Sequence, residues 1–328
     1  MGSSQVSFPP FEEEIPIELK DSAGVIDDIA DFDISDDNLF IAVLSNIKQS
    51  IAIFDTRGQL ISTFCHAGRS NKEYVHADKI ILSESKVFIW DSSTLRCLIY
   101  DLDGGYVDSL GPFKTNVRSI DVIGNFLIFY DLGKSDNLIE IFDKEKKEFI
   151  SSTGLISSEQ KVLSIIPSPG PFAVDGNMIY YMTTDKLNLF CADFPDCSKE
   201  EKLFSLKSKS FIRETVIDHK AITKNISKLN EYHDRCSRII GLISVKGLFY
   251  IFTKEGRTKT IGHRIKDIDS HVCLYAVNRT GEIKSKTNHE TPPVAPELLK
   301  CINGNMYYLV SVPLSESEEK HILHRIIL

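Results

Sequence analysis

The sequence predicts an all-β fold, a six-bladed β-propeller with four-stranded antiparallel blades, on three observations. First, one unit of short apolar runs and polar turns recurs six times along the 328 residues. Second, the runs are rich in β-branched and aromatic residues, which is typical of strands. Third, successive units begin about 39 to 70 residues apart, close to the ~40 to 50 residues of a propeller blade plus its loops.

The clearest mark of each unit is its second run, which follows a tight turn. The six second runs begin at Leu39, Val87, Phe126, Met178, Leu248 and Met306. Gly-Asn precedes three of them, at 124–125, 176–177 and 304–305, and this dipeptide is typical of a two-residue turn with positive φ. The runs are almost continuously apolar, as expected of strands buried on both faces between neighbouring blades.

We expect a single domain over residues 1–328, whose blades span 29–64, 77–110, 117–153, 172–204, 238–283 and 297–328. The last unit contains only three strands before the chain ends. Residues 14–20 alternate polar with apolar side chains, so they are predicted to add the missing outermost strand and to close the ring. Pro16 fits there, because an outermost strand has one unpaired edge.

One segment, residues 205–237, departs from the repeat and is predicted to be a helical insert. Apolar side chains recur at helical spacing between Asp218 and His233, with Asp218 as the expected N-cap. The insert has seven basic and four acidic residues in a chain of net charge −8. One interpretation is a helix that caps one end of the propeller with a solvated basic face.

The alternative interpretation of the insert is a contact for an anionic ligand or a partner. Its basic residues would be Lys220, Lys224 and Lys228. Further basic residues in what we expect to be the following loop would join them, namely Lys254, Arg257, Lys259 and Arg264.

The composition narrows the range of partners. The chain has 42% hydrophobic and 26% charged residues, as in an ordinary globular protein. Its pI of about 5.6 argues against nucleic acid or an anionic membrane as the main partner. No run approaches the ~18 apolar residues of a membrane-spanning helix. Residues 1–6 lack the basic and apolar regions of a signal peptide, a start that is also consistent with a leader having been removed.

The seven cysteines form no C-x-x-C pair, which argues against a zinc ribbon or a thioredoxin motif. Cys97, Cys191 and Cys273 fall in apolar runs and are expected to be buried, reduced thiols. For Cys191 and Cys197 a disulfide across a hairpin is the alternative.

The sequence contains no catalytic motif, since G-x-S-x-G, P-loop and H-E-x-x-H patterns are all missing. We therefore predict no catalytic residue and no metal ligand. His321 and His324 would point to opposite faces of a strand. Trp90 lies in a run expected to be buried, which argues against a carbohydrate-stacking platform.

The best candidate for a ligand site is the loop between the first two blades. It concentrates cationic and aromatic side chains, and propeller loops commonly bind ligands. The residues are His66, Arg69, Lys72, Tyr74 and His76. The alternative is a polar surface loop without a ligand.

The strand and turn pattern, the six units and the closing strand resemble the six-bladed propellers of the NHL and TolB-like superfamily, especially uncharacterised bacterial cell-envelope members, many of them lipoproteins. After the first blade such proteins often carry G-x-G-x-G-P-x-E-Y. In the corresponding stretch only Gly68, Glu73 and Tyr74 match, and the other glycines and the proline are missing. The resemblance implies a lipid-anchored precursor whose leader and cysteine are absent from this chain.

These observations favour a non-enzymatic binding propeller of a bacterial envelope, in the periplasm or at the outer-membrane surface. Its partner would be a protein, a small molecule or a carbohydrate, and no cofactor is expected. The alternative is a metal-dependent hydrolase or lactonase with a divalent cation in the central channel, because in some propellers of this size the ligands come from separate blades.

Overall fold

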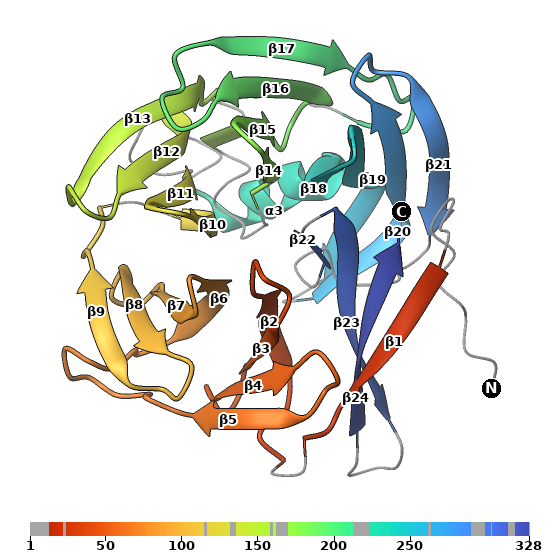
Figure 1. Cartoon of the computed structure of the whole chain (residues 1–328). Coiled ribbons are helices and arrows are strands. Elements are labelled where there is room, and N and C mark those ends of the chain that lie inside the picture. Colours follow the sequence, from red (N-terminus) through yellow and green to blue (C-terminus); the bar gives the residue numbers. More distant parts are fainter. Residues whose placement is uncertain are drawn as a thin grey trace.

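Six four-stranded antiparallel sheets surround a central axis in the computed structural model (Figure 1). The predicted six-bladed propeller is therefore confirmed. The structure describes residues 13–21, 24–114, 117–131, 136–157, 160–161, 170–212, 224–261, 264–289, 299–302, 304–313 and 319–327.

The first five blades are meanders whose strands follow chain order from the centre outward. Their strands are β2 (Ile29–Ile34), β3 (Phe40–Ser45), β4 (Ile51–Asp55) and β5 (Leu60–Phe64); β6 (Ala77–Ser83), β7 (Lys86–Asp91), β8 (Arg96–Asp101) and β9 (Tyr106–Leu110); β10 (Val117–Ile123), β11 (Phe126–Asp131), β12 (Asn137–Asp143) and β13 (Glu148–Leu155); β14 (Phe172–Asp175), β15 (Met178–Met182), β16 (Asn188–Asp193) and β17 (Glu200–Ser205); β18 (Arg238–Val245), β19 (Leu248–Ile261), β20 (Arg264–Asn278) and β21 (Ile283–His289).

The sixth blade combines the two ends of the chain. Its strands are β22 (Leu299–Ile302), β23 (Asn305–Pro313), β24 (Glu319–Ile327) and β1 (Glu13–Leu19). β1 pairs antiparallel with β24, from Glu13 opposite Ile327 to Leu19 opposite His321. The backbone N–H of Lys20 then donates to the carbonyl of Gly58 at 2.8 Å, so the closing strand is also joined to the first blade. The predicted closure of the ring is confirmed.

The apolar core lies between neighbouring blades. Tyr180 on β15 meets Phe249 on β19 with ring centroids 4.9 Å apart, which joins blades four and five. Trp90 on β7 is buried and lies 5.9 Å from Phe129 on β11, between blades two and three. The second runs identified in the sequence are thus buried middle strands.

The Gly-Asn turns explain the regular spacing inside the units. Gly124 and Gly176 start two-residue turns with φ of +51° and +61°, and the strands on either side pair directly. In the last blade Ile302 pairs with Asn305, so the turn lies one residue earlier than the sequence predicts. Glycine suits these positions because it adopts positive φ without steric cost.

The insert contains a helix in its described part, and the predicted start of a helix at Asp218 stays a prediction. α3 (Ile226–Arg235) starts after Asn225, whose side chain accepts the N–H groups of Ser227 and Lys228. The expected N-cap, Asp218, lies outside the described residues. Within the described ranges no helix is long and apolar enough to cross a bilayer.

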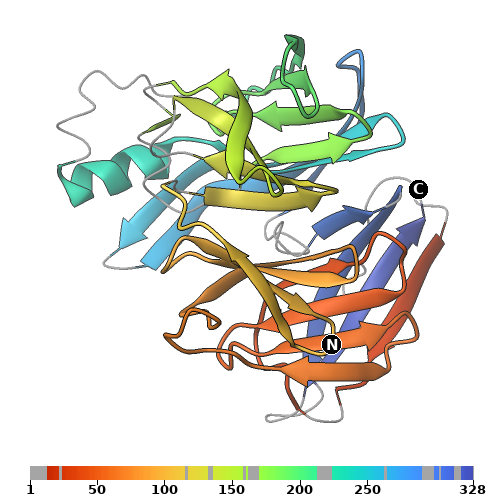
Figure 2. The ribbon, with the colours of Figure 1, turned by 60° about the vertical axis from the view of Figure 1, so that its left-hand side comes forward.

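The fifth blade differs from the sequence prediction beyond residue 253. β19 and β20 have 14 and 15 residues and form a long hairpin that projects from the ring (Figure 2). The basic residues expected in a loop here belong to these strands instead, namely Lys254, Arg257, Lys259 and Arg264. The segment is polar, so the apolar runs used to find the strands did not include it.

All seven cysteines are free thiols, including Cys191 and Cys197, for which a disulfide was the alternative. Cys97, Cys191 and Cys273 are buried. These three match the expected reduced thiols in the middle strands.

We expect deletion of residues 1–20 to lower the melting temperature by at least about 10 °C, because the last blade loses its outermost strand and Leu19 leaves the core. Circular dichroism during heating measures this change. A variant that lacks only residues 1–12 keeps β1 and serves as the control. Equal melting temperatures of the two variants would refute the role of β1 in closing the ring.

Candidate functional site

A cavity of about 510 Å³ occupies the centre of the ring. The innermost strands of all six blades line it, namely β2, β6, β10, β14, β18 and β22. It arises because the innermost strands surround an axial channel that their side chains only partly fill. We call this space the channel.

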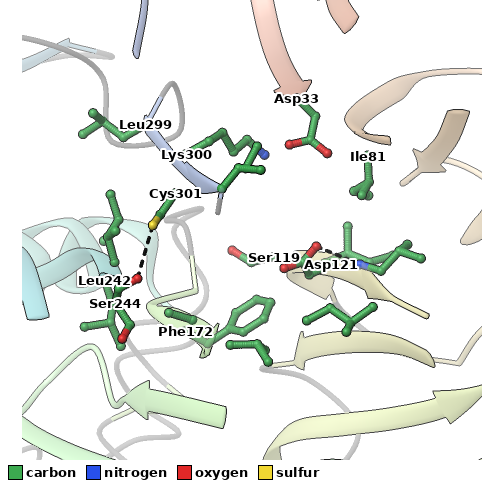
Figure 3. A pocket seen from close by; sticks show the side chains of 18 of the residues that line it. Asp33, Ile81, Ser119, Asp121, Phe172, Leu242, Ser244, Leu299, Lys300 and Cys301 are labelled. Carbon is green, nitrogen blue, oxygen red and sulfur yellow. Dashed lines mark hydrogen bonds between the residues drawn. The ribbon is translucent and has the colours of Figure 1, made fainter. Parts of the chain in front are cut away.

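One side of the channel carries charged side chains from four blades, which we call the channel charge cluster. Its members are Asp31, Asp33, Lys79, Asp121 and Lys300. The Nζ of Lys300 lies 3.5 Å from Oδ1 of Asp31, and the Nζ of Lys79 lies 3.7 Å from the same oxygen. Figure 3 shows Asp33, Asp121 and Lys300 reaching into the channel from three different blades. The cluster thus gathers three acids around two bases.

The local sequence of β2 explains how two of the acids are positioned. Asp31 and Asp33 are two residues apart, so their side chains lie on the same face of the strand. Asp31 accepts the backbone N–H of Ile80 at 3.1 Å, and Asp33 accepts that of Leu82 at 2.8 Å. Both donors belong to β6, the innermost strand of the next blade, which has no strand partner on that edge. The two carboxylates therefore satisfy a free strand edge and join the first two blades.

Burial and charge set the protonation states in the channel. Burial raises the pKa of Asp33 to about 7, although the Lys300 ammonium and the Leu82 N–H favour the carboxylate form. Burial also raises the pKa of Asp121, again against the effect of Lys300. For Lys300 burial alone would lower the pKa, but Asp31, Asp33 and Asp121 together raise it above its ordinary value. Lys300 is thus a permanent cation, while Asp33 gains or loses a proton near neutral pH.

The other side of the channel is mostly apolar. Phe172 on β14, Leu242 on β18 and Leu299 on β22 line it (Figure 3). Cys301 donates its thiol to the carbonyl of Ser244 at 3.3 Å, so its polar atom is directed to the backbone. The channel can therefore hold a molecule that has one polar and one apolar part.

The structure places the predicted ligand loop, residues 66–76, between β5 and β6, and two of its members make internal contacts. Tyr74 is fully buried, and its hydroxyl donates to the carbonyl of Gln49 at 2.6 Å. The Nε2 of His66 lies 2.8 Å from the carbonyl of Gly104, and its ring stacks on Tyr100 at 5.1 Å. These contacts join the first and second blades.

The other members of that loop are exposed. His76 lies 3.5 Å from Asp78, and the ammonium of Lys72 lies 5.5 Å from the ring centre of Tyr106. Arg69 is also exposed. The loop lies outside the channel lining, and its role as a ligand site stays a prediction.

The predicted basic insert is described only in part. Lys224 and Lys228 are exposed at the start of α3, whereas Lys220 lies outside the described residues. A partner contact at this surface also stays a prediction.

The channel charge cluster was not predicted from the sequence. One pattern in the sequence could have indicated the cluster. The first run of a unit is otherwise apolar but contains charged residues, as in Ile29–Ile34 and Leu299–Ile302. In a propeller the first strand of each blade is innermost, so such residues are candidates for the channel.

No family model matches the sequence, and no curated protein is significantly similar to it. Solved structures share its fold. A member of the DUF4221 family from Bacteroides vulgatus superposes with a TM-score of 0.66 at 10% identity, covering 97% of this chain and 96% of that chain. A Bacteroides fragilis protein named "Putative exported protein" gives 0.65 at 10% identity, covering 96% and 95%. A luciferin-regenerating enzyme gives 0.50 at 10% identity, covering 95% of each chain. At such identities the likeness shows the fold alone.

We expect Asp33→Asn to reduce the loss of stability that accompanies a rise in pH from 5 to 8.5. Because the pKa of Asp33 is raised on folding, the group stabilises the fold at low pH, and this contribution is lost as pH rises through about 7. The asparagine still accepts the Leu82 N–H but carries no charge. Urea unfolding should therefore show a gain for the variant relative to wild type of at most about 3 kcal/mol between pH 5 and pH 8.5.

Exposed Asp103→Asn is the matched control and should follow the wild-type pH profile. If Asp33→Asn also follows the wild-type profile, the assigned titration of Asp33 near pH 7 is wrong.

Proposed function

We propose that this chain is a non-enzymatic binding protein whose channel holds a small ligand. The observation that carries the proposal is the cavity of about 510 Å³ at the centre of the ring, with the channel charge cluster on one side and apolar side chains on the other. Its volume lies in the ~300 to 1,000 Å³ range of small-molecule sites, and the combination of apolar walls with a few converging polar groups is typical of them.

The lining indicates the chemistry of the ligand. Asp33 and Asp121 provide hydrogen-bond acceptors, and Lys300 provides a charged donor. Phe172 and Leu242 offer apolar surface opposite them. A small molecule with hydroxyl or amine groups at one end and an apolar part at the other suits this lining. Sugars and amino acids belong to this class.

A hydrolase or lactonase with a divalent cation in the channel is the alternative, and the position of Lys300 weighs against it. The lysine ammonium lies among the carboxylates that would have to hold the ion, and the pKa of Lys300 is raised by those same carboxylates. A divalent cation there would meet a like charge in a site of low dielectric constant. The luciferin-regenerating enzyme shares the fold, which supports neither function over the other.

We further propose a location in the bacterial cell envelope. The name of the Bacteroides fragilis protein, whose fold matches over 95% of its length, supports this. Immunoblotting of cytoplasmic, periplasmic and membrane fractions from the native host tests it, and the protein should appear in an envelope fraction. Its recovery with a cytoplasmic marker enzyme would contradict the proposal, including the lipid-anchored precursor implied by the sequence resemblance.

A thermal-shift screen tests ligand binding in the channel. We expect a compound from sets of free amino acids, monosaccharides and oligosaccharides to raise the melting temperature by about 5 °C at a concentration near 100 times its dissociation constant. Lys300→Met should abolish the shift, because the ligand loses the charged donor. Lys72→Met, in the predicted ligand loop, is the matched control and should keep the shift.

Two results would contradict the channel proposal. One is a shift that survives Lys300→Met and is lost in Lys72→Met, because the ligand would then bind the 66–76 loop. The other is the detection, by metal analysis, of one calcium or zinc ion per chain in protein purified without chelator. This metal would have to be lost in an Asp33→Asn/Asp121→Asn double variant. That result would favour the metal-dependent alternative.

A further inference from the structure

A second group of chemically active side chains lies outside the channel lining, on the long β19–β20 hairpin. Glu255 on β19 pairs directly with His271 on β20, and Thr253 pairs with Cys273. Directly opposed residues of an antiparallel pair share a face, and so do residues two apart on one strand. The ligand atoms of Glu255, His271 and Cys273 therefore converge, and all lie within 4.8 Å of one another. We call these three residues the hairpin triad.

We propose that the hairpin triad binds a divalent transition-metal ion, with Zn²⁺ as the best fit. Its carboxylate oxygen, imidazole nitrogen and thiolate sulfur are the three ligand types that zinc uses in proteins, at ~2.0 to 2.3 Å. Calcium and magnesium prefer oxygen ligands alone, so they do not suit this set. Three protein ligands leave a fourth coordination position for water.

The burial of the triad fits a site that is closed on one side and open on the other. Glu255 and Cys273 are fully buried, whereas His271 is half-buried. An ion would thus enter past the imidazole and meet the two buried ligands behind it.

The carboxylate of Glu255 is held in place by hydroxyl groups. Its Oε2 accepts hydrogen bonds from Ser208 at 2.9 Å and from Ser210, both in the segment after β17 of the preceding blade. Its Oε1 accepts hydrogen bonds from Thr253 at 3.1 Å and from Tyr275. Such outer partners orient metal-ligating carboxylates and are part of what a metal site needs.

Burial and hydrogen bonds act on the two buried members of the triad. Burial alone would raise the pKa of Glu255, but hydrogen bonds from Ser210, Tyr275 and Ser208 bring it below the ordinary value, so the group is ionised. Burial raises the pKa of the Cys273 thiol to about 11, and Glu255 adds to this rise.

Lys286 balances the charge of Glu255 before an ion binds. Its ammonium lies 3.6 Å from Oε2 of Glu255 and 4.8 Å from the ring centre of Tyr275. The side chain of Lys286 is 32% exposed and is paired with one carboxylate, whereas Lys300 in the channel interacts with three, so a cation at the hairpin triad has a single ion pair to displace.

Cobalt substitution tests the proposal on the full chain after treatment with chelator and desalting. Cobalt(II) should bind one ion per chain and give a thiolate-to-cobalt charge-transfer band, and Zn²⁺ should remove that band by competition. Cys273→Ser should abolish the band, and His271→Gln should weaken Zn²⁺ binding at least 100-fold in calorimetry. Cys97→Ser removes another fully buried strand thiol and is the matched control that should keep the band.

The absence of a charge-transfer band in the folded wild-type chain would overturn the proposal, and so would its persistence in Cys273→Ser. Because His271 is half-buried, His271→Gln should fold even where the cysteine variant does not, and unchanged Zn²⁺ affinity in it would also overturn the proposal. The site is independent of the channel, so Asp33→Asn/Asp121→Asn should bind cobalt like wild type.

Discussion

The pairing of β1 with β24 is the contact on which the rest of the ring depends, because it joins the two ends of the chain in one sheet. A closed ring fixes the distances between blades that share no strand pairing. Asp33 and Asp121 come from β2 and β10, and Lys300 comes from β22, so their meeting is a property of the closed ring rather than of any single blade. The channel and its electrostatics therefore follow from a contact far from the axis.

The two sites described above use charge in different ways. In the channel, carboxylates replace strand partners for the free edge of β6 and hold Lys300 charged, so this lysine is already paired with carboxylates. On the β19–β20 hairpin, hydroxyl groups keep Glu255 ionised beside a thiol and an imidazole. The first arrangement suits an organic molecule with donors and acceptors, and the second suits a soft cation.

The fold was predictable because the apolar runs, the Gly-Asn turns and the three-stranded last unit are local patterns. The N-cap of α3 was not predicted, since nothing in the sequence singled out Asn225 among the polar residues of the insert. The channel charge cluster was missed because four blades each contribute one or two charged residues, and only the ring brings them together. The hairpin triad was missed for a related reason: His271 lay outside the apolar runs, and Cys273 appeared to be one more buried thiol.

The shared sixth blade also affects how the chain folds as it is synthesised. The first five sheets can form in order as the ribosome delivers them, because each uses consecutive residues. The sixth cannot, because β1 emerges first and its partner β24 emerges last. Throughout translation the β1 segment lacks its partner β24, and an unpaired strand edge invites pairing with other chains. Glu18 and Pro16 within β1 are residue types that discourage such pairing, so this strand has features that protect a nascent chain while it waits for its partner.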